Sequence, residues 1–438
     1  MKLHQISLAV IALAASAAHA APVPTFTIHL DGATATAKSV ADVSKAMCKD
    51  AASTQVYALA TNAKLAGVYC SDVNTTNSGL AAGTKLWITK NNVDGSLEAF
   101  ERAIKHGATK TTEIDVSTCT DPTFAGTTLT CSGTVAVDAN GGFSDVEGKI
   151  WEARNALTFS GIAYTTKAGF AGQGFGVAVG DKLYAALQTA QGLTAGLYDV
   201  ANQPNITKQQ FTSILSNVGA YHTDWTPFLG TALGATNNMN LCRRGLTSGT
   251  QAGMDVYFLN SPCANAKPTF GQLGASLDAD SAGTFKVIEN AGTGDVKTCL
   301  NAHDQDLVNA AVKADGTAAD EFAIGIMSLE NTPGASDHWH FVKLDGVTPT
   351  PDASQRQTVI DGQYNYAFES VFVYRNDNTS ANKNFMNKFV ALMGNPAKVA
   401  ALTGIFNVPG ASTYSSFPTR VHRGSTGGNS CSPFSLYE

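Results

Sequence analysis

The residues best suited to chemistry stand between Cys242 and Cys263, in the stretch CRRGLTSGTQAGMDVYFLNSPC. Arg244 comes four residues before Ser248, which opens Ser-Gly-Thr and then an apolar run with helical spacing. A helix N-terminus carries unpaired N–H groups and a partial positive charge, and a serine or threonine there adds a hydroxyl donor. The guanidinium group of an arginine forms a fork that suits phosphate or sulfate. The stretch therefore predicts a site for a small tetrahedral anion.

The same order of strand, small-residue turn and helix recurs twice nearer the N-terminus. An apolar strand at 26–30 is followed by the turn DGATATA and a helix pattern. A strand at 86–88 is followed by a turn ending at Ser96 and by a helix that Gly107 ends. Three such helix N-termini, brought to one point, would bind one oxyanion. A serine or threonine before a helix is also an ordinary cap, so a single junction predicts little by itself.

The rest of the chain continues the alternation of strands and helices. Thr207 stands as a cap before one helix, Phe385 and Phe389 mark another, and Asn395-Pro396 is expected to open a further one. Strands are expected at 323–329, 340–347 and 366–375. This alternation predicts an α/β fold with largely parallel strand pairing.

Length, composition and charge limit the classes of protein. The 438 residues exceed one typical domain, which favours two domains or one two-lobed molecule, and 44% hydrophobic residues allow a substantial core. The formal charge of −6 and the lack of a lysine or arginine block argue against nucleic acid as a general partner.

The first 20 residues read as a secretory signal peptide. Lys2 is followed by an apolar run and by Ala18-His19-Ala20, so cleavage is expected before Ala21. The apolar run is shorter than the roughly 20 residues that a membrane-spanning helix needs. The sequence therefore predicts export rather than a membrane anchor.

Eight cysteines, an even number, agree with export and predict disulfides formed in an oxidising compartment. Their spacing does not fit a structural zinc site, which needs pairs two to four residues apart. Two local bridges are favoured, and the pairing among the other four cysteines stays open. The favoured pairs are Cys48–Cys70 and Cys119–Cys131, and the others are Cys242, Cys263, Cys299 and Cys431.

Four blocks of sequence resemble the periplasmic phosphate-binding proteins of ABC transporters. ITKQQFTSILSNVGAYHTDW is similar to the family's capped helix that leads to a tryptophan, here Trp225, and GFGVAVGDKLYAALQ is similar to the strand that enters the second lobe. AIGIMSLEN and FVKLDGVTPT resemble later strands, and the order agrees from about residue 26 to residue 405. The resemblance implies the type 2 periplasmic-binding-protein fold, a two-lobed α/β fold with mixed, mostly parallel sheets and an interlobe cleft.

The resemblance also implies four loops that hold the anion. They are a Gly-Ala-Thr turn at 32–34, a serine at a helix start, a Ser-Asp pair, and an arginine four residues before Ser-Gly-Thr. Ala35 stands where the family usually has an aromatic residue, Leu246 stands where an aspartate holds the arginine, and Arg243 adds a second cation. The residues implied to bind the anion are Thr34, Ala35, Ser96, Asp145, Arg244, Ser248, Gly249 and Thr250.

Asp145 is expected to select the anion. A carboxylate accepts the proton of HPO₄²⁻ or H₂PO₄⁻, which fully ionised sulfate lacks, so Asp145 would favour phosphate over sulfate. The alternative is that Asp145 caps a helix beginning near Val146. Phosphonate, arsenate and organic phosphates stay open as ligands.

The family's organisation implies one lobe at 21–162 plus 363–438 and a second lobe at 163–362. Hinge closure would bring the first three loops on one wall against the fourth loop on the other. The chain is then expected to be a monomeric binding protein, periplasmic or secreted, that passes phosphate or a related oxyanion to an ABC permease in the inner membrane. No catalysis, cofactor or metal is expected.

Two other classes stay open. A secreted interaction protein could keep the fold without an anion site, which the disulfides and Leu246 favour. An exported phosphatase or other hydrolase is the second, although neither GGFSDVEG nor GLTSGTQ has the Gly-x-Ser-x-Gly pattern of a nucleophile elbow. His338 and His340 share one face of a strand, where zinc is conceivable, but a solvent-facing strand end is the favoured interpretation.

Overall fold

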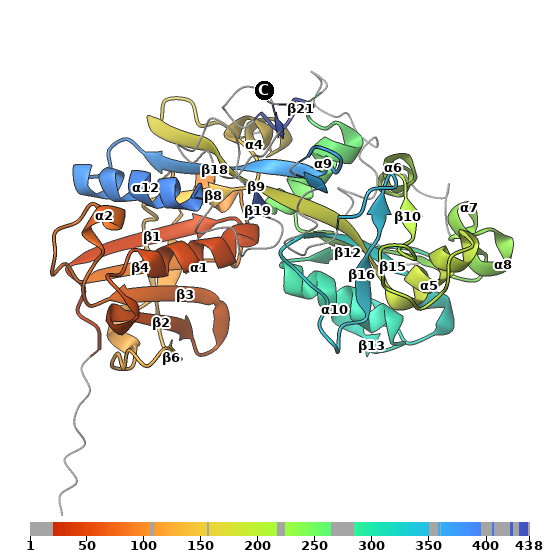
Figure 1. Cartoon of the computed structure of the whole chain (residues 1–438), viewed down its shortest axis with the longest axis horizontal. Helices are drawn as coiled ribbons and strands as arrows, with labels where there is room; N and C mark the ends of the chain where they lie inside the picture. Colours follow the sequence, from red (N-terminus) through yellow and green to blue (C-terminus); the bar gives the residue numbers. More distant parts are fainter. Residues whose placement is uncertain are drawn as a thin grey trace, which may run out of the picture.

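The structure of the chain is a computed structural model that forms two lobes joined by long strands (Figure 1). Some of the sequence predictions fall outside the described residues. They are the signal peptide at 1–20 and the helix-ending or helix-opening residues Gly107 and Pro396. No described helix is long and apolar enough to cross a membrane. The described residues are 21–105, 109–155, 157–216, 224–263, 284–349, 358–359, 361–395, 405–406, 421–423 and 429–436.

The first lobe is a mixed sheet with helices packed against it. Its elements are β1 (Phe26–Gly32), α1 (Ala37–Ala46), β2 (Thr54–Leu59), β3 (Asn62–Cys70), α2 (Thr75–Ser78), β4 (Leu86–Asn91), α3 (Glu98–Glu101), β5 (Thr111–Ile114), β6 (Thr128–Cys131), β7 (Thr134–Val137), β8 (Gly141–Ser144), α4 (Gly148–Asn155) and α12 (Ser380–Met393). β1 pairs in parallel with β4 and β8, while β3 pairs antiparallel with β4 and β2. Helix α1 contacts α12, and α3 contacts β1 and β8.

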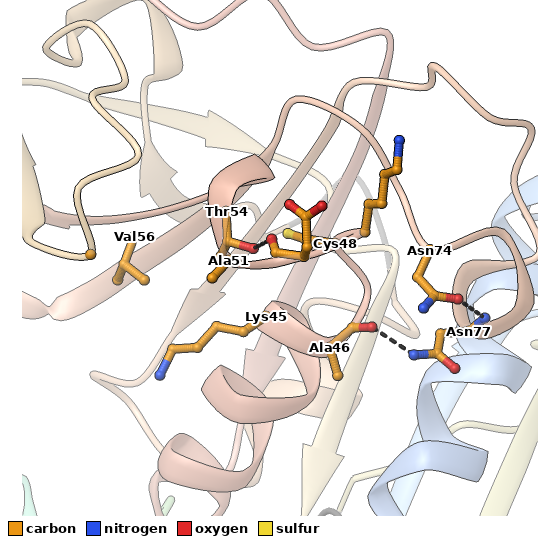
Figure 2. Close-up of a pocket in the computed structure, with 11 residues that line it drawn as sticks. Lys45, Ala46, Cys48, Ala51, Thr54, Val56, Asn74 and Asn77 are labelled. Atoms are coloured by element: carbon orange, nitrogen blue, oxygen red, sulfur yellow. Dashed lines mark hydrogen bonds between the residues drawn. The ribbon is translucent and has the colours of Figure 1, made fainter.

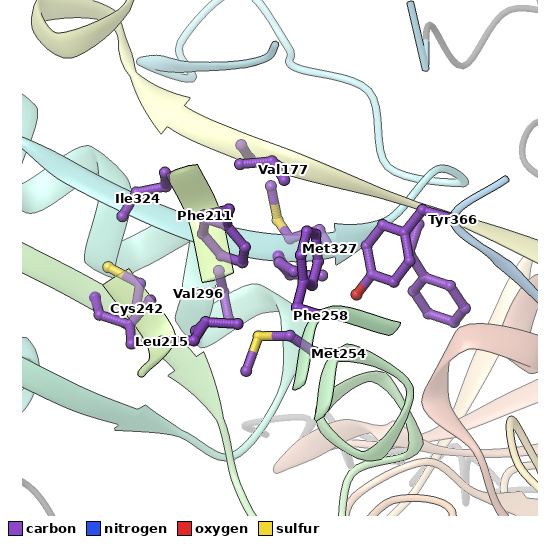
Figure 3. Packing of buried hydrophobic residues seen from close by; sticks show 14 of the residues in the cluster. Val177, Phe211, Leu215, Cys242, Met254, Phe258, Val296, Ile324, Met327 and Tyr366 are labelled. Atoms are coloured by element: carbon purple, nitrogen blue, oxygen red, sulfur yellow. The ribbon is translucent and has the colours of Figure 1, made fainter. Parts of the chain in front are cut away.

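The second lobe is built on β11, which pairs in parallel with β12 and β15. Its elements are α5 (Asp181–Ala190), β10 (Asn205–Ile206), α6 (Lys208–Leu215), α7 (Thr226–Leu229), α8 (Thr231–Gly234), β11 (Met239–Arg244), α9 (Gly249–Leu259), β12 (Phe285–Asn290), α10 (Thr293–Asp304), β13 (Val308–Asn309), β14 (Ala314–Asp315), β15 (Ala323–Ser328), β16 (Trp339–Phe341) and β17 (Lys343–Leu344). Phe211, Phe258, Val296, Met327 and Tyr366 pack together in its core (Figure 3).

Two long strands, β9 (Tyr164–Gly180) and β18 (Ala367–Arg375), cross between the lobes (Figure 1). β9 pairs antiparallel with β18 through Gly174 and with β15 from Phe175 to Val179, so the strands of both lobes form one thirteen-stranded sheet. The expected parallel pairing holds for β1, β4, β8 and for β11, β12, β15. Elsewhere the pairing is mixed. The crossing strands β9 and β18 run antiparallel to their neighbours, and β3 runs antiparallel to β2 and β4, whereas β2 with β6 and β10 with β17 are parallel. The lobe limits near 162 and 362 stay a prediction.

The local sequence signals match most of the observed elements. Thr207 caps α6 and forms a capping box with Gln210, as helix-start chemistry predicts. The helix expected after Ser96 is short, with α3 covering only four residues before turns. The strand expected at 340–347 is divided into β16 and β17, because β16 pairs with β9 whereas β17 pairs with β10.

Four disulfides join the eight cysteines, and the two expected local bridges are among them. One of the others ties β11 to α10 inside the second lobe, and the last ties the segment after α9 to the segment near the C-terminus. The bridges are Cys48–Cys70, Cys119–Cys131, Cys242–Cys299 and Cys263–Cys431.

Replacing both Cys242 and Cys299 by alanine should lower the free energy of unfolding by about 4 kcal/mol, because this bridge closes a sequence separation of 57 residues. The control is the double substitution of Cys119 and Cys131, which are separated by 12 residues and should cost about 3 kcal/mol in the same chain-entropy model. Urea unfolding without reductant measures both differences. A Cys242/Cys299 variant as stable as the native chain would contradict this bridge.

Candidate functional site

Three of the expected loops leave the same edge of the first lobe's sheet. Because β1, β4 and β8 run parallel, their carboxyl ends meet, and the segments after them carry Thr34, Ser96 and Asp145. Gly32 ends β1 with a φ of +95°, and a Cβ there would lie 2.1 Å from the Phe143 carbonyl oxygen. Only glycine therefore lets the ends of β1 and β8 approach this closely.

Ser96 and Asp145 are in direct contact. Ser96 Oγ donates to Asp145 Oδ2 at 3.2 Å and accepts from the Asp145 N–H at 3.3 Å. Both side chains are buried, and Asp145 Oδ1 has no hydrogen-bond partner among the described residues. The turn before α4 is held instead by Ser144 Oγ, which accepts from the Val146 N–H at 3.3 Å and from Trp151 Nε1 at 3.1 Å. These bonds do not support Asp145 as a helix cap.

The fourth loop comes from the second lobe and touches the loop after β4. The Leu97 N–H donates to the Thr247 carbonyl oxygen at 3.0 Å, and Thr247 Oγ1 donates to the Asp94 carbonyl oxygen at 2.7 Å. Ser248 caps α9 by accepting from the Gln251 N–H at 3.4 Å. The start of α9 is thus held against the first lobe by one backbone hydrogen bond and by one from the Thr247 side chain.

Gly249, the first residue of α9, lies against Ser96 and Asp145. A Cβ on Gly249 would lie 2.3 Å from Ser96 Oγ and 2.5 Å from Asp145 Oδ2. Further along α9, the buried Asp255 forms an ion pair with Arg154 of α4, which fixes the helix. The positive end of an eleven-residue helix therefore faces the Asp145 carboxylate.

Arg244 is buried at the end of β11, and its guanidinium is held by the segment after β12. Nη2 donates to the Ala291 carbonyl oxygen at 2.9 Å, and Nη1 donates to Thr293 Oγ1 at 3.1 Å. Nε has no hydrogen-bond partner among the described residues. Burial lowers the pKa of Arg244 to about 10, against the opposing charges of Asp145 and Asp295.

The two departures near Arg244 have a structural explanation. Leu246 is 39% exposed, and the holding role expected of an aspartate at this position falls to Ala291 and Thr293. Arg243 forms an ion pair with Glu289, whose Oε2 lies 2.8 Å from Nη1. Arg243 is therefore paired with a carboxylate of β12, and we do not count its charge toward the candidate anion site.

Lys90, which sequence reasoning missed, also acts on Asp145. Its Nζ donates to the carbonyl oxygens of Gly32 at 3.0 Å and Asn91 at 2.6 Å. Burial lowers the pKa of Lys90 to about 8, opposed by the charges of Asp31, Glu113 and Asp145. A lysine inside a strand carries no motif, and the sequence offered no signal for it beyond its position near the end of β4.

The burial of Asp145 dominates the electrostatics of the site. Burial raises the pKa of Asp145 to about 6, although the Ser96 hydroxyl, Arg244 and Lys90 act in the opposite direction. Glu330 adds a second buried carboxyl group, and burial together with the charge of Asp145 raises its pKa to about 8. Two buried carboxyl groups therefore lie near the cations Arg244 and Lys90, and their raised pKa values place both close to the neutral range.

Thr34 and Thr250, which were also expected to bind the anion, lie in the same loops but outside the contact between Ser96, Asp145 and Gly249. Thr34 opens a short 3₁₀ helix before α1, and Thr250 lies in the first turn of α9. Within the described part of the chain, neither side chain forms a hydrogen bond with Ser96, Asp145 or Arg244. Ala35 is buried in the hydrophobic core.

A surface cavity of about 550 Å³ lies elsewhere on the first lobe (Figure 2). Lys45, Cys48, Thr54, Asn74 and Asn77 line it, near the C-terminal end of α1. The candidate residues lie instead near the beginning of that helix, so this cavity is not the candidate site.

No family model and no curated protein matches the chain. Among solved structures, the chain is similar to a protein from Clostridium perfringens that is assigned as a phosphate ABC transporter substrate-binding protein and was solved with bound phosphate. The identity is 15% and the TM-score is 0.46, and the match covers 86% of this chain and 99% of that chain. It is also similar to an ABC-type phosphate transport receptor from Vibrio cholerae, with 13% identity, a TM-score of 0.33, and coverage of 57% and 73%. A third similar structure is a protein assigned to phosphate binding from Planctomyces limnophilus DSM 3776, with 13% identity, a TM-score of 0.32, and coverage of 80% and 81%.

The substitution Asp145→Asn should remove one contribution to the pH dependence of the free energy of unfolding. The pKa of Asp145 is raised from 3.8 to about 6 in the folded chain, so protonation of Asp145 favours folding. This contribution is fully present below the unfolded pKa and is lost as the pH rises through about 6. Urea unfolding measures the free energy of unfolding of the wild type and of the variant at each pH. The wild-type value, relative to that of the variant, should fall by about 2 to 3 kcal/mol between about pH 4 and pH 7.

Ser96→Ala is the matched control for this prediction. It keeps the carboxyl group but removes the hydroxyl that lowers the pKa of Asp145. The pH dependence should persist in this variant and extend to higher pH. Equal slopes in the wild type and in Asp145→Asn would show that Asp145 does not titrate in this range.

Proposed function

We propose that the chain is an exported solute-binding protein that captures phosphate, or a similar small oxyanion, between its lobes for uptake through an ABC permease. The observation that carries this proposal is the contact of Gly249, at the positive end of α9, with Ser96 and Asp145 of the other lobe. Arg244 supplies a buried cation at the same place, and a helix N-terminus with a buried arginine suits an oxyanion. Closure of the lobes would surround the anion with donors from both.

Asp145 gives this site its selectivity. A buried acceptor with no partner for Oδ1 can accept the proton of HPO₄²⁻ or H₂PO₄⁻. Sulfate has no such proton at neutral pH, so it would place its own charge against the carboxylate. Asp145 thereby distinguishes phosphate from sulfate, two anions of nearly equal size.

The contacts of Ser96 support binding rather than turnover. Ser96 Oγ donates to Asp145 Oδ2 and accepts from the Asp145 N–H, so no histidine stands between the hydroxyl and the carboxylate. A nucleophilic serine needs a base oriented by a third group. We therefore assign the site to capture of the anion, in a monomer that works in the periplasm.

Phosphate should stabilise chain that has been stripped of anions. A ligand bound only by the folded state adds about 2.7 kcal/mol at a hundredfold excess over Kd. Sulfate should have little effect on the wild type, and Asp145→Asn should lose this discrimination, because an amide can donate to either anion. Thermal unfolding and calorimetry with both anions measure these effects.

The rival functions give different outcomes in the same series. A melting temperature indifferent to millimolar phosphate would contradict anion capture and leave an interaction protein of the same fold. Turnover of a chromogenic phosphate ester would indicate an exported phosphatase instead.

Arg244→Lys should weaken phosphate binding at least tenfold, about 1.4 kcal/mol, because the charge remains but the fork is lost. The matched control is Arg243→Lys, since Arg243 pairs with Glu289 and should leave the affinity nearly unchanged. Isothermal calorimetry of both variants with phosphate decides between them. A loss at Arg243 with none at Arg244 would reverse the assignment of the binding arginine.

A further inference from the structure

A second polar cluster lies in the other lobe, where three segments far apart in the sequence meet. Asp181 begins α5, Asp304 ends α10, and His338 directly precedes β16. His338 Nδ1 lies 3.8 Å from Asp181 Oδ2 and 3.6 Å from Asp304 Oδ2. One ligand atom from each of the three residues lies within 4.8 Å of the others. The fold therefore places one imidazole nitrogen and two carboxylate oxygens around a common point.

The separations within this cluster fit shared coordination better than direct pairing. Hydrogen bonds between nitrogen and oxygen rarely exceed about 3.2 Å, and both distances from His338 Nδ1 are longer. Ligand atoms about 2.0–2.2 Å from a zinc ion lie roughly 3.3–3.6 Å from one another at ordinary coordination angles. Small movements of side chains would bring all three atoms to such an ion.

The remaining contacts orient the carboxylates, and Asp181 also forms a side-chain hydrogen bond with Tyr198. Asp304 is 5% exposed, and its Oδ1 accepts from the Lys182 N–H at 2.6 Å. Asp181 Oδ1 lies 2.7 Å from His340 Nδ1, and the ring of His340 stacks on Tyr198 with centroids 3.7 Å apart. Metal-ligating side chains are commonly held by such outer hydrogen bonds. The Oδ2 atoms of Asp181 and Asp304 are thus presented to His338.

The lysine that follows Asp181 in the chain pairs with carboxylates outside the cluster. Lys182 Nζ pairs with Asp306 Oδ2 at 2.8 Å and with Glu321 Oε2 at 2.6 Å. A divalent cation would bring further positive charge to the Asp181 and Asp304 carboxylates, whose Oδ2 atoms lie 3.8 Å and 3.6 Å from His338 Nδ1.

We propose that Asp181, Asp304 and His338 bind a divalent transition metal ion of the zinc class. An imidazole with two carboxylates suits zinc and its neighbours rather than magnesium or calcium, which prefer oxygen ligands alone. His340 Nδ1 orients Asp181 through its contact with Oδ1. The His338 side chain is 43% exposed, which leaves a further coordination position of the ion open to solvent. The ion would tie α5, α10 and β16 together, away from the four loops of the candidate anion site.

This proposal reverses the expectation for the two histidines. From the sequence alone, His338 and His340 are expected at a solvent-facing strand end without metal. The structure adds Asp181 and Asp304, which stand 157 and 34 residues before His338 and carry no metal-binding spacing. Their approach depends on where α5 and α10 pack against β16, which only the fold reveals.

The test is calorimetric titration of the chelator-treated full chain with Zn²⁺. One zinc ion per chain and a higher melting temperature are expected. Asp304→Asn and His338→Ala should each weaken zinc binding at least tenfold. The matched control is Asp306→Asn, which removes a neighbouring carboxylate held by Lys182 and should change the affinity less than threefold.

Two outcomes would overturn the proposal: no zinc binding by the wild type, or equal zinc affinity in Asp304→Asn and Asp306→Asn. His338→Ala keeps the test decisive if Asp304→Asn does not fold, because His338 lies at the surface. Co²⁺ gives a second readout, since its visible absorption should appear on the wild type and be lost in His338→Ala. Phosphate affinity should stay unchanged in His338→Ala, so this test stands apart from the proposed function.

Discussion

Asp145 places a carboxyl group in an interior that excludes water, where an uncompensated charge is strongly unfavourable. Ser96 donates the one hydrogen bond that its carboxylate accepts within the described residues, and Arg244 and Lys90 act on it through charge alone. The start of α9 can reach this group because Gly249 has no side chain. The approach of the two lobes at this point therefore depends on a missing methyl group beside a buried charge.

The sheet explains how residues so far apart in sequence reach this point. Parallel pairing of β1, β4 and β8 brings three loops to one edge, and parallel pairing of β11 with β12 and β15 presents the fourth. β9 and β18 pass from one lobe to the other, so the two edges belong to one continuous sheet. The lobe closure that we propose would therefore have to act through these two strands.

Local patterns predicted the elements that local chemistry determines. The apolar runs predicted β1, β4, β15 and β18, and Thr207 predicted the start of α6. These signals are readable in the sequence because helix capping and the alternation of apolar residues act over only a few residues. Asp145 and Gly249 were predicted by resemblance, and the structure brings them together. Lys90, the partners of Arg244, and the approach of Asp304 to His338 were not predictable, since each depends on which strand or helix packs beside it. The predominance of parallel pairing was wrong for the same reason.

Arg244 and Asp145 are not joined in the way that a structural ion pair is. A structural pair would close into direct hydrogen bonds, as Arg154 and Asp255 do between α4 and α9. Arg244 instead donates to Ala291 and Thr293, while Asp145 accepts from Ser96, so each charge is held by its own lobe. Opposite charges that are both buried, close enough to interact and yet not bonded to each other forgo most of the energy that would offset their desolvation. Such an arrangement is costly for folding alone, and an anion that carries a proton would complete it, because its charged oxygens bind the arginine and its hydroxyl binds the aspartate.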